Sequence, residues 1–322
     1  MADIRYLCIS DLHLGADNSL LTHLRPGTSE VDPTQPSAVL VQLAKCLESL
    51  GALNDGRRKP TLILNGDVLE LALALDNKAV MAFKRFLELL FPSNQEPLVD
   101  SQIIFIPGNH DHHLWEAARE TQYTEFLKRK PPGSFLEPPW HTTKMFEPDL
   151  VDATLLNGVI RRYPQMVRLG LFVGTVYPNL LLLSKDETKC AIFMHGHFIE
   201  SIYGLMSKLR TSLFPDGQEP TQVWDMEAEN FAWIDFFWST MGRSGDLGTD
   251  IERIYEILLV PRMRKKLSAG NCTIPSYKRS RESSYVSQAL RLEYHQMFKR
   301  RWSVHWMMQN HFSFWAENEL NR

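Results

Sequence analysis

Side chains that can bind a divalent metal ion gather in four short blocks of this sequence. The blocks are Asp11-Leu12-His13, Gly66-Asp67, Gly108-Asn109-His110-Asp111 and His195-Gly196-His197. One Asp-x-His pair carries little information because chance produces it often, but an ordered set of four blocks is a strong signal. Carboxylate, imidazole and amide groups suit Mn, Fe, Zn or Ni, and they lack the thiolates of a structural zinc site. The blocks therefore predict metal-dependent chemistry.

Each block follows an apolar segment that has the composition of a buried β-strand. We expect strands over residues 4–10, within 61–67 and within 101–111, separated by helical patterns at 39–53 and 77–91. Residues 177–197 predict two more strands around a Lys-Asp-Glu-Thr turn, the second ending at His195. A β-α-β-α-β order implies a mostly parallel sheet, which binds ligands outside the carboxyl ends of its strands. The four blocks lie at these ends, so we expect them to meet.

Beyond residue 200 the strand patterns stop, and helical spacing occurs at 222–241, 250–267 and 283–319. We expect a metal-binding α/β domain over residues 1–200 and a helical, aromatic-rich and basic cap over 201–322. The net charge of the chain is −3, but residues 243–301 contain 13 Lys and Arg against 6 Asp and Glu. A solvated basic face is the default interpretation of this segment; contact with an anionic substrate, nucleic acid or a membrane surface is the alternative.

The composition is that of a folded globular protein. The chain has 322 residues, of which 44% are hydrophobic and 23% charged, and these values exclude collagen-like and wholly disordered classes. The 4 cysteines are far apart, which argues against a disulfide framework and a zinc knuckle. The N-terminus lacks a signal-peptide pattern, and no apolar run reaches the roughly 18 residues of a membrane helix. We therefore expect a cytoplasmic protein without a membrane span.

Over about residues 4–200 the ordered blocks resemble the signature of the calcineurin-like metallophosphoesterases, which reads D-x-H, G-D, G-N-H-[DE], H and G-H-x-H. The resemblance implies an α/β protein with a four-layer α/β/β/α sandwich, here followed by the helical cap. It also implies two divalent metal ions, with Mn expected first and Fe, Zn or Ni as alternatives. Asp67 would bridge the two ions. The other implied ligands are Asp11 and His13 for one ion, and Asn109 and His195 for the other.

By the same resemblance, His110 faces the substrate as a proton donor or transition-state clamp, and Asp111 orients or polarises it. Both residues are therefore expected to be catalytic. The closing G-H-x-H block, which supplies one histidine to each ion, is missing from this chain. Only Gly196-His197-Phe198-Ile199 is similar, with isoleucine at the position of the last ligand.

The missing block leaves several histidines as possible replacements. His197 is included among the expected metal ligands, and His112 and His113 are also close to the site in sequence. His305 and His311 lie in an aromatic helical stretch, where packing is the favoured interpretation. The UDP-diacylglucosamine hydrolases, which the chain resembles, place a helical insertion between the fourth block and the closing one. By that alignment, the chain is either a fragment or has a diverged site.

These observations favour hydrolysis of a phosphoester or pyrophosphate bond in an anionic substrate by a metal-activated hydroxide at a two-metal site. A catalytically silent scaffold for protein binding is the first alternative, and a nuclease that uses the basic cap is the second. The aromatic residues of the predicted helix 222–241 are expected to pack in a core, with stacking on a ring or contact with acyl chains as alternatives. These residues are Trp224, Phe231, Trp233, Phe236, Phe237 and Trp238.

Overall fold

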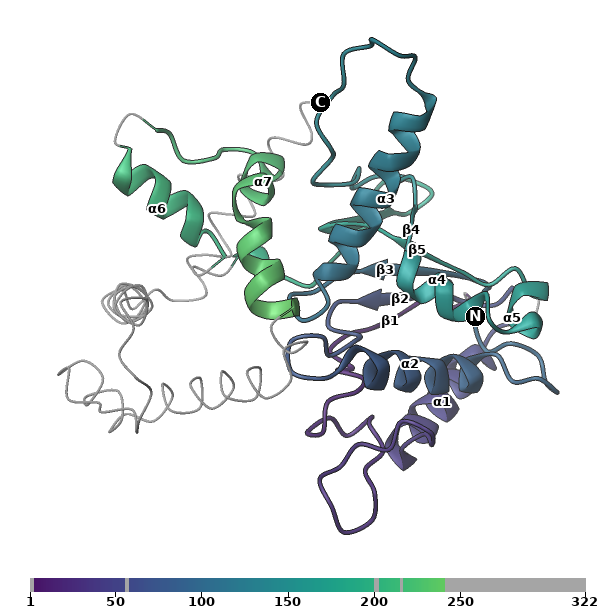
Figure 1. Cartoon of the computed structure of the whole chain (residues 1–322). Coiled ribbons are helices and arrows are strands. Elements are labelled where there is room, and N and C mark those ends of the chain that lie inside the picture. The colour runs from purple at the N-terminus through teal and green to yellow at the C-terminus, as the bar shows by residue number, and fades with distance from the viewer. Residues whose placement is uncertain (1–2, 56–57, 200–202, 215–216, 241–322) are drawn as a thin grey trace, which may run out of the picture.

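The centre of the molecule is a five-stranded sheet with the order β1-β2-β3-β5-β4 (Figure 1). The computed structural model describes residues 3–55, 58–199, 203–214 and 217–240. Strands β1, β2, β3 and β5 are parallel, and β4 is antiparallel to β5 at one edge. The strands are β1 (Tyr6–Ile9), β2 (Thr61–Asn65), β3 (Gln102–Ile106), β4 (Val151–Asp152) and β5 (Phe172–Thr175). The three predicted strands that precede metal-binding blocks are therefore neighbours.

Helices connect the parallel strands, as the sequence predicts. Helix α1 (Ala38–Gly51) links β1 to β2, and α2 (Asp76–Leu90) links β2 to β3. The first of these begins after Ser37, whose hydroxyl accepts a hydrogen bond from the amide of Leu40 at 3.0 Å. The remaining helices of this part of the chain are α3 (His113–Arg129), α4 (Thr154–Ile160) and α5 (Pro164–Arg168).

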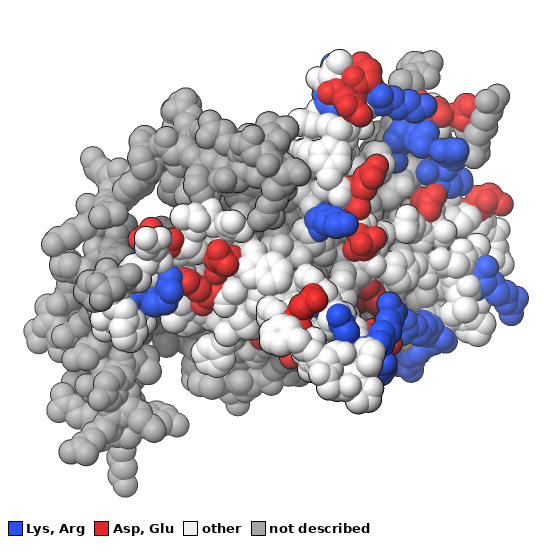
Figure 2. Space-filling view, turned by 90° about the horizontal axis from the view of Figure 1, so that it is seen from above, with Lys and Arg blue, Asp and Glu red and all other residues white. Residues whose placement is uncertain are grey.

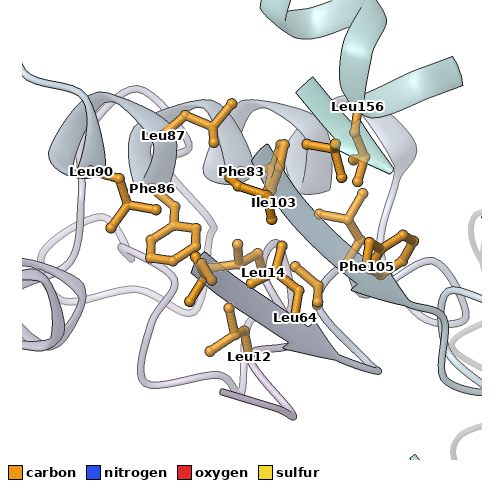
Figure 3. Packing of buried hydrophobic residues seen from close by; sticks show 14 of the residues in the cluster. Leu12, Leu14, Leu64, Phe83, Phe86, Leu87, Leu90, Ile103, Phe105 and Leu156 are labelled. Atoms are coloured by element: carbon orange, nitrogen blue, oxygen red, sulfur yellow. The ribbon is translucent and has the colours of Figure 1, made fainter. Parts of the chain in front are cut away.

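The largest core cluster lies between one face of the sheet and helices α1, α2 and α4 (Figure 3). Leu64 and Phe105 from the strands pack there with Phe83 and Phe86 of α2 and with Leu156 of α4, all fully buried. Burial of each of these side chains stabilises the fold by about 1.5–3 kcal/mol. The core holds the strands rigidly, and so it fixes the positions of the loops that follow them.

The opposite face of the sheet packs against a second, two-stranded sheet. Its strands β6 (Asn179–Leu183) and β7 (Cys190–Met194) are antiparallel, which confirms the predicted hairpin. Because side chains alternate along a strand, Ile63 and Ile104 face this second sheet and pack with Leu180. The described residues thus form a helix layer, a mixed sheet and a second sheet, which agrees with the expected α/β fold and accounts for three of its four expected layers. No described helix covers the exposed start of β7 at residues 190–192.

Among the described residues, a short 3-10 helix, η1 (His197–Ile199), and three longer helical segments follow the second sheet. They are α6 (Leu205–Leu213), α7 (Val223–Ile234) and the π-helical segment η2 (Asp235–Thr240). The predicted helix at 222–241 is confirmed, whereas the helices predicted at 250–267 and 283–319 lie outside the described residues. The domain boundary between residues 200 and 201 stays a prediction. Among the described residues, no helix is both long and apolar enough to cross a membrane.

A buried polar cluster attaches α7 to the rest of the molecule. Glu227 of α7 is 1% exposed, and its Oε2 accepts a hydrogen bond from the Tyr177 hydroxyl at 3.0 Å. The same hydroxyl lies 3.0 Å from Nε2 of His197, and the rings of His197 and Tyr203 are in contact. Burial, partly opposed by hydrogen bonds from Tyr203 and Tyr177, raises the pKa of Glu227 to about 8. The carboxyl group therefore carries a proton in much of the folded population at neutral pH.

This proton predicts a pH-dependent stability. Because the pKa of Glu227 is raised in the folded state, its carboxyl group stabilises the fold most at pH values below 4.5, its ordinary pKa. This stabilisation is lost as the pH rises from 4.5 through about 8. In that range the free energy of unfolding of the unmodified protein should fall relative to Glu227→Gln by about 1 kcal/mol per pH unit. Urea denaturation across this range measures the difference.

Glu229→Gln is the matched control, because Glu229 lies on the same helix and forms an ion pair with Arg210 at 2.8 Å. It should leave the pH slope of the unmodified protein unchanged. If the free energy of unfolding of Glu227→Gln and of the unmodified protein depended on pH in the same way, the raised pKa of Glu227 would be contradicted.

Candidate metal centre

Metal-binding side chains from four loops converge at the carboxyl edge of the sheet. His13, Asp67 and His110 offer ligand atoms that all lie within 4.8 Å of one another. Asp11, Asp67 and His195 form a second group with the same spacing. Asp67 belongs to both groups and is 4% exposed. The loops after β1, β2, β3 and β7 therefore meet around one buried carboxylate.

The backbone at this edge has an unusual conformation. Asp11, His13 and Asp67 have φ angles of 55°, 44° and 51°, in the left-handed region that non-glycine residues seldom adopt. The Asp11 amide donates to the Gly66 carbonyl at 3.0 Å, and the His13 amide donates to the Asp67 carbonyl at 2.9 Å. These bonds hold the first two loops in register. Strained residues of this kind cluster at functional sites, where the surrounding structure maintains them.

Two glycines allow the loops to approach so closely. A side chain at Gly66 would overlap the ring of His195, and one at Gly108 would overlap the carboxylate of Asp67. Gly66 also has a φ angle of 84°, which glycine adopts without a steric penalty. The Gly-Asp and Gly-Asn-His-Asp blocks thus need glycine because the ligands of neighbouring loops occupy that space.

An amide oxygen lies beside the second group of ligand atoms. Nε2 of His195 lies 3.2 Å from Oδ2 of Asp67 and 3.0 Å from Oδ1 of Asn109. Burial lowers the pKa of His195, but the hydrogen bond and charge of Asp67 outweigh it and raise the pKa to about 9. Burial raises the pKa of Asp67, but His195 and His110 lower it to about 2. These atoms together favour a positive charge between them.

A divalent cation would supply this positive charge, and the side chains of the site are suitable ligands for such an ion. Two carboxylates, imidazole nitrogens and an amide oxygen are available, and sulfur ligands are absent among the described residues of both groups. A bound ion would displace the proton on Nε2 of His195, so ion binding would release protons. The residues present therefore fit the divalent metal ions that the resemblance implies.

Glu70 is a site residue that the sequence analysis missed. It is 2% exposed, and its two carboxylate oxygens each lie 2.9 Å from a histidine Nδ1, one from His13 and one from His110. Burial lowers the pKa of His110, but the hydrogen bond and charge of Glu70 and the charge of Asp67 raise it to about 9. A carboxylate on Nδ1 directs Nε2 of each ring away from itself and into the site.

A signal for Glu70 was present in the sequence. It is the one charged residue in the run Val68-Leu69-Glu70-Leu71-Ala72-Leu73-Ala74-Leu75, which directly follows Asp67. A lone carboxylate in an apolar run is buried with its neighbours and so needs a partner. His13 and His110 are the partners of Glu70.

Asp111 does not have the position that was expected. Its carboxylate accepts hydrogen bonds from the amides of Gly108 and Val68, each at 2.7 Å, and from the amide of Leu69 at 3.2 Å. A longer contact of 3.3 Å joins it to the amide of Asp67. Glu70 makes the hydrogen bond to His110, whereas the hydrogen bonds of Asp111 go to backbone amides. The charge of Asp111 still helps to raise the pKa of His110. Asp111 joins the loop after β2 to the loop after β3.

The replacement histidines lie outside the two groups of ligand atoms. His197 is 9% exposed and faces Tyr177 and Tyr203 in the cluster that attaches α7. His112 is fully buried, and burial lowers its pKa to about 4. His113 pairs through Nδ1 with Asp235 at 3.0 Å. His305 and His311 lie outside the described residues.

Glu70→Gln tests the arrangement, because it keeps the volume and removes the charge. We expect the pKa of His110 to fall from about 9 toward its ordinary value of 6.5, and the affinity for Mn²⁺ to fall about 10–100-fold. Titration of the histidine ring protons by NMR in metal-free protein and calorimetric titration with Mn²⁺ measure the two effects. Glu88→Gln on the surface of α2 is the control and should change neither. An unchanged Mn²⁺ affinity in Glu70→Gln would show that Glu70 does not orient a ligand.

The comparisons with known proteins agree with this geometry. No curated protein and no solved structure matches the chain. A family model described as calcineurin-like phosphoesterase matches residues 4–224, which includes all four blocks, Glu70 and the start of α7. The matched segment is more than half of the chain. The chain therefore belongs to the calcineurin-like phosphoesterase family.

Proposed function

We propose that this protein hydrolyses phosphoester or pyrophosphate bonds at a centre of two divalent metal ions. The observation that carries the proposal is the position of Asp67, which is shared by two groups of ligand atoms, beside His110. The family is one of hydrolases, and the metal-binding side chains support metal-dependent hydrolysis in general. The number of ions, a preference for Mn and the phosphoester class are parts of the proposal.

The ligands divide between the two proposed ions around Asp67. A carboxylate has two oxygens, so Asp67 can serve both positions. By the family resemblance, Asp11 and His13 would complete one position, and Asn109 and His195 the other. The ligand atoms of Asp11 lie near those of Asp67 and His195, and those of His13 lie near those of Asp67 and His110, so both positions border the Asp67 carboxylate. Two divalent ions, when bound, lower the pKa of a water molecule and neutralise charge on the phosphoryl oxygens. The protein's own contribution is to hold the ligands in place through the strained loops and through Glu70.

His110 is suited to donate a proton to the departing oxygen. Its side chain is 17% exposed, so a substrate can reach it. Glu70 holds Nδ1, which leaves Nε2 for the substrate side. In the metal-free protein, burial lowers the pKa of the ring, but the hydrogen bond and charge of Glu70 and the charge of Asp67 raise it to about 9. General acids placed in this way typically contribute about 10²–10⁴-fold to the rate.

The alternatives are less well supported by the site. A silent scaffold gains nothing from a buried carboxylate that links two histidines, because burying charged groups costs stability. A nuclease would need a basic surface. In the face shown in Figure 2, basic and acidic side chains of the described residues are interspersed. The basic segment 243–301 lies outside the described residues.

Asp67→Asn tests the shared ligand. The substitution preserves volume, but it removes the charge that serves both groups of ligand atoms. We expect loss of bound Mn²⁺ and less than about 10% of the parent hydrolysis of p-nitrophenyl esters, because metal assistance accounts for several kcal/mol of the barrier. Elemental analysis and a chromogenic assay measure the two effects. Asp186→Asn, in the exposed turn between β6 and β7, is the control. Activity well above this level would exclude Asp67 as the shared ligand.

His110→Ala tests the proton donor. We expect the variant to lose rate most strongly with poor leaving groups, because a good leaving group needs little protonation. Rates across a series of aryl phosphate esters with increasingly basic leaving groups measure this dependence. His23→Ala is the control, because His23 lies outside both groups of ligand atoms. It should retain the dependence of rate on leaving-group basicity that the unmodified protein shows. The same loss of rate for every ester would remove His110 from the acid role.

A further inference from the structure

The segment η2 lies beyond the part of the chain that matches the family model, yet it contacts the centre. The match ends at residue 224, whereas η2 spans Asp235–Thr240. The Ser239 hydroxyl donates a hydrogen bond to the Asn109 carbonyl at 2.6 Å, and Ser239 is fully buried. Asp235 pairs with His113 at the start of α3. In Figure 1, α7 accordingly ends beside the first turn of α3.

Trp238 of the same segment borders the proposed proton donor. The centroids of the Trp238 and His110 rings are 5.7 Å apart, with an angle of 50° between the ring planes. Trp238 also packs against the apolar cluster of Phe198, Tyr203 and Ile234, which holds the indole in place. Trp238 is partly buried. A rigid aromatic surface thus stands next to His110.

The local backbone explains how both contacts arise. π-Helical turns are rare, and they occur mostly as short insertions at functional sites. In η2 the wider turn places Trp238 against His110 while Ser239 reaches the backbone of Asn109. The hydrogen bond of Ser239 therefore fixes the position of Trp238 relative to the centre.

The geometry points to Trp238 as a specificity-determining residue that selects substrates with a flat aromatic leaving group. This inference rests on the proposed function. Because His110 gives its proton to the departing oxygen, the group attached to that oxygen lies next to His110 and meets the Trp238 ring. An indole face stacks on aromatic rings, and such stacking is worth a factor of about 5–150 in affinity. An aliphatic leaving group of similar acidity would gain much less.

The test compares the hydrolysis of phenyl and hexafluoroisopropyl phosphate esters in the presence of Mn²⁺. Their leaving groups have similar acidity, and each ester is tested both as a monoester and as a methyl diester. The unmodified protein should prefer the phenyl ester in kcat/KM by about tenfold. Trp238→Leu should abolish most of this preference, and Trp238→Phe should retain most of it. Calorimetric titration with benzylphosphonate and butylphosphonate, which cannot be hydrolysed, should show the same order of affinities.

Phe236→Leu is the matched control, because Phe236 is in the same segment but 60% exposed. It should keep the preference of the unmodified protein. If the unmodified protein hydrolyses the two esters equally well, or if Trp238→Leu keeps the phenyl preference, the inference is wrong and the proposed function stands. If the unmodified protein hydrolyses neither ester, the phosphoester part of the proposed function fails, and the inference falls with it.

Discussion

The carboxylate of Asp111 holds together the two loops that carry the centre of the site. It accepts hydrogen bonds from amides of the loop after β2 and of the loop after β3, and it is fully buried. Burial and the nearby charge of Asp67 raise the pKa of Asp111, whereas the amide hydrogen bonds favour the ionised form. Without this anchor the amides of Gly108 and Val68 would be buried without partners, which typically costs about 1–3 kcal/mol for each group. The positions of Asp67, Asn109 and His110 all depend on it.

Charge balance is the second constraint on the site. Three carboxylates, those of Asp67, Glu70 and Asp111, are almost completely buried within a short distance of one another. Asp67 and Asp111 help to raise the pKa of both His110 and His195 to about 9, and Glu70 adds to the effect on His110. The imidazoles therefore supply the positive charge that compensates the carboxylates. Divalent ions supply the same compensation more fully, which explains why so acidic a cluster is compatible with a stable fold.

The sequence predicted the fold well where local pattern determines structure. Strands β1, β2 and β3, the helices between them and the β6–β7 hairpin follow from apolar runs and turn residues over short segments. The short strands β4 and β5 were missed. β4 has only 2 residues, and no period can be recognised over so short a length.

The candidate ligands could be named from the sequence, whereas their supporting contacts could not. Asp11, His13, Asp67, Asn109 and His195 were named from the blocks, and the structure brings them together. The partner of His110, the backbone role of Asp111 and the burial of His197 depend on contacts between distant segments. Tyr177 and Glu227, for example, are 50 positions apart. Sequence spacing carries no information about such pairs.

The hydrogen bond from Ser239 to the main chain of Asn109 spans 130 positions in the sequence. This hydrogen bond couples the attachment of α7 and η2 to the conformation of the loop after β3, which carries Asn109 and His110. Any ligand that binds the loop more tightly when η2 is attached must, by thermodynamic reciprocity, strengthen that attachment by the same coupling free energy. Substitutions on α7 far from the centre, including those around Glu227, would thus change metal affinity to the extent that they change how often α7 and η2 are attached.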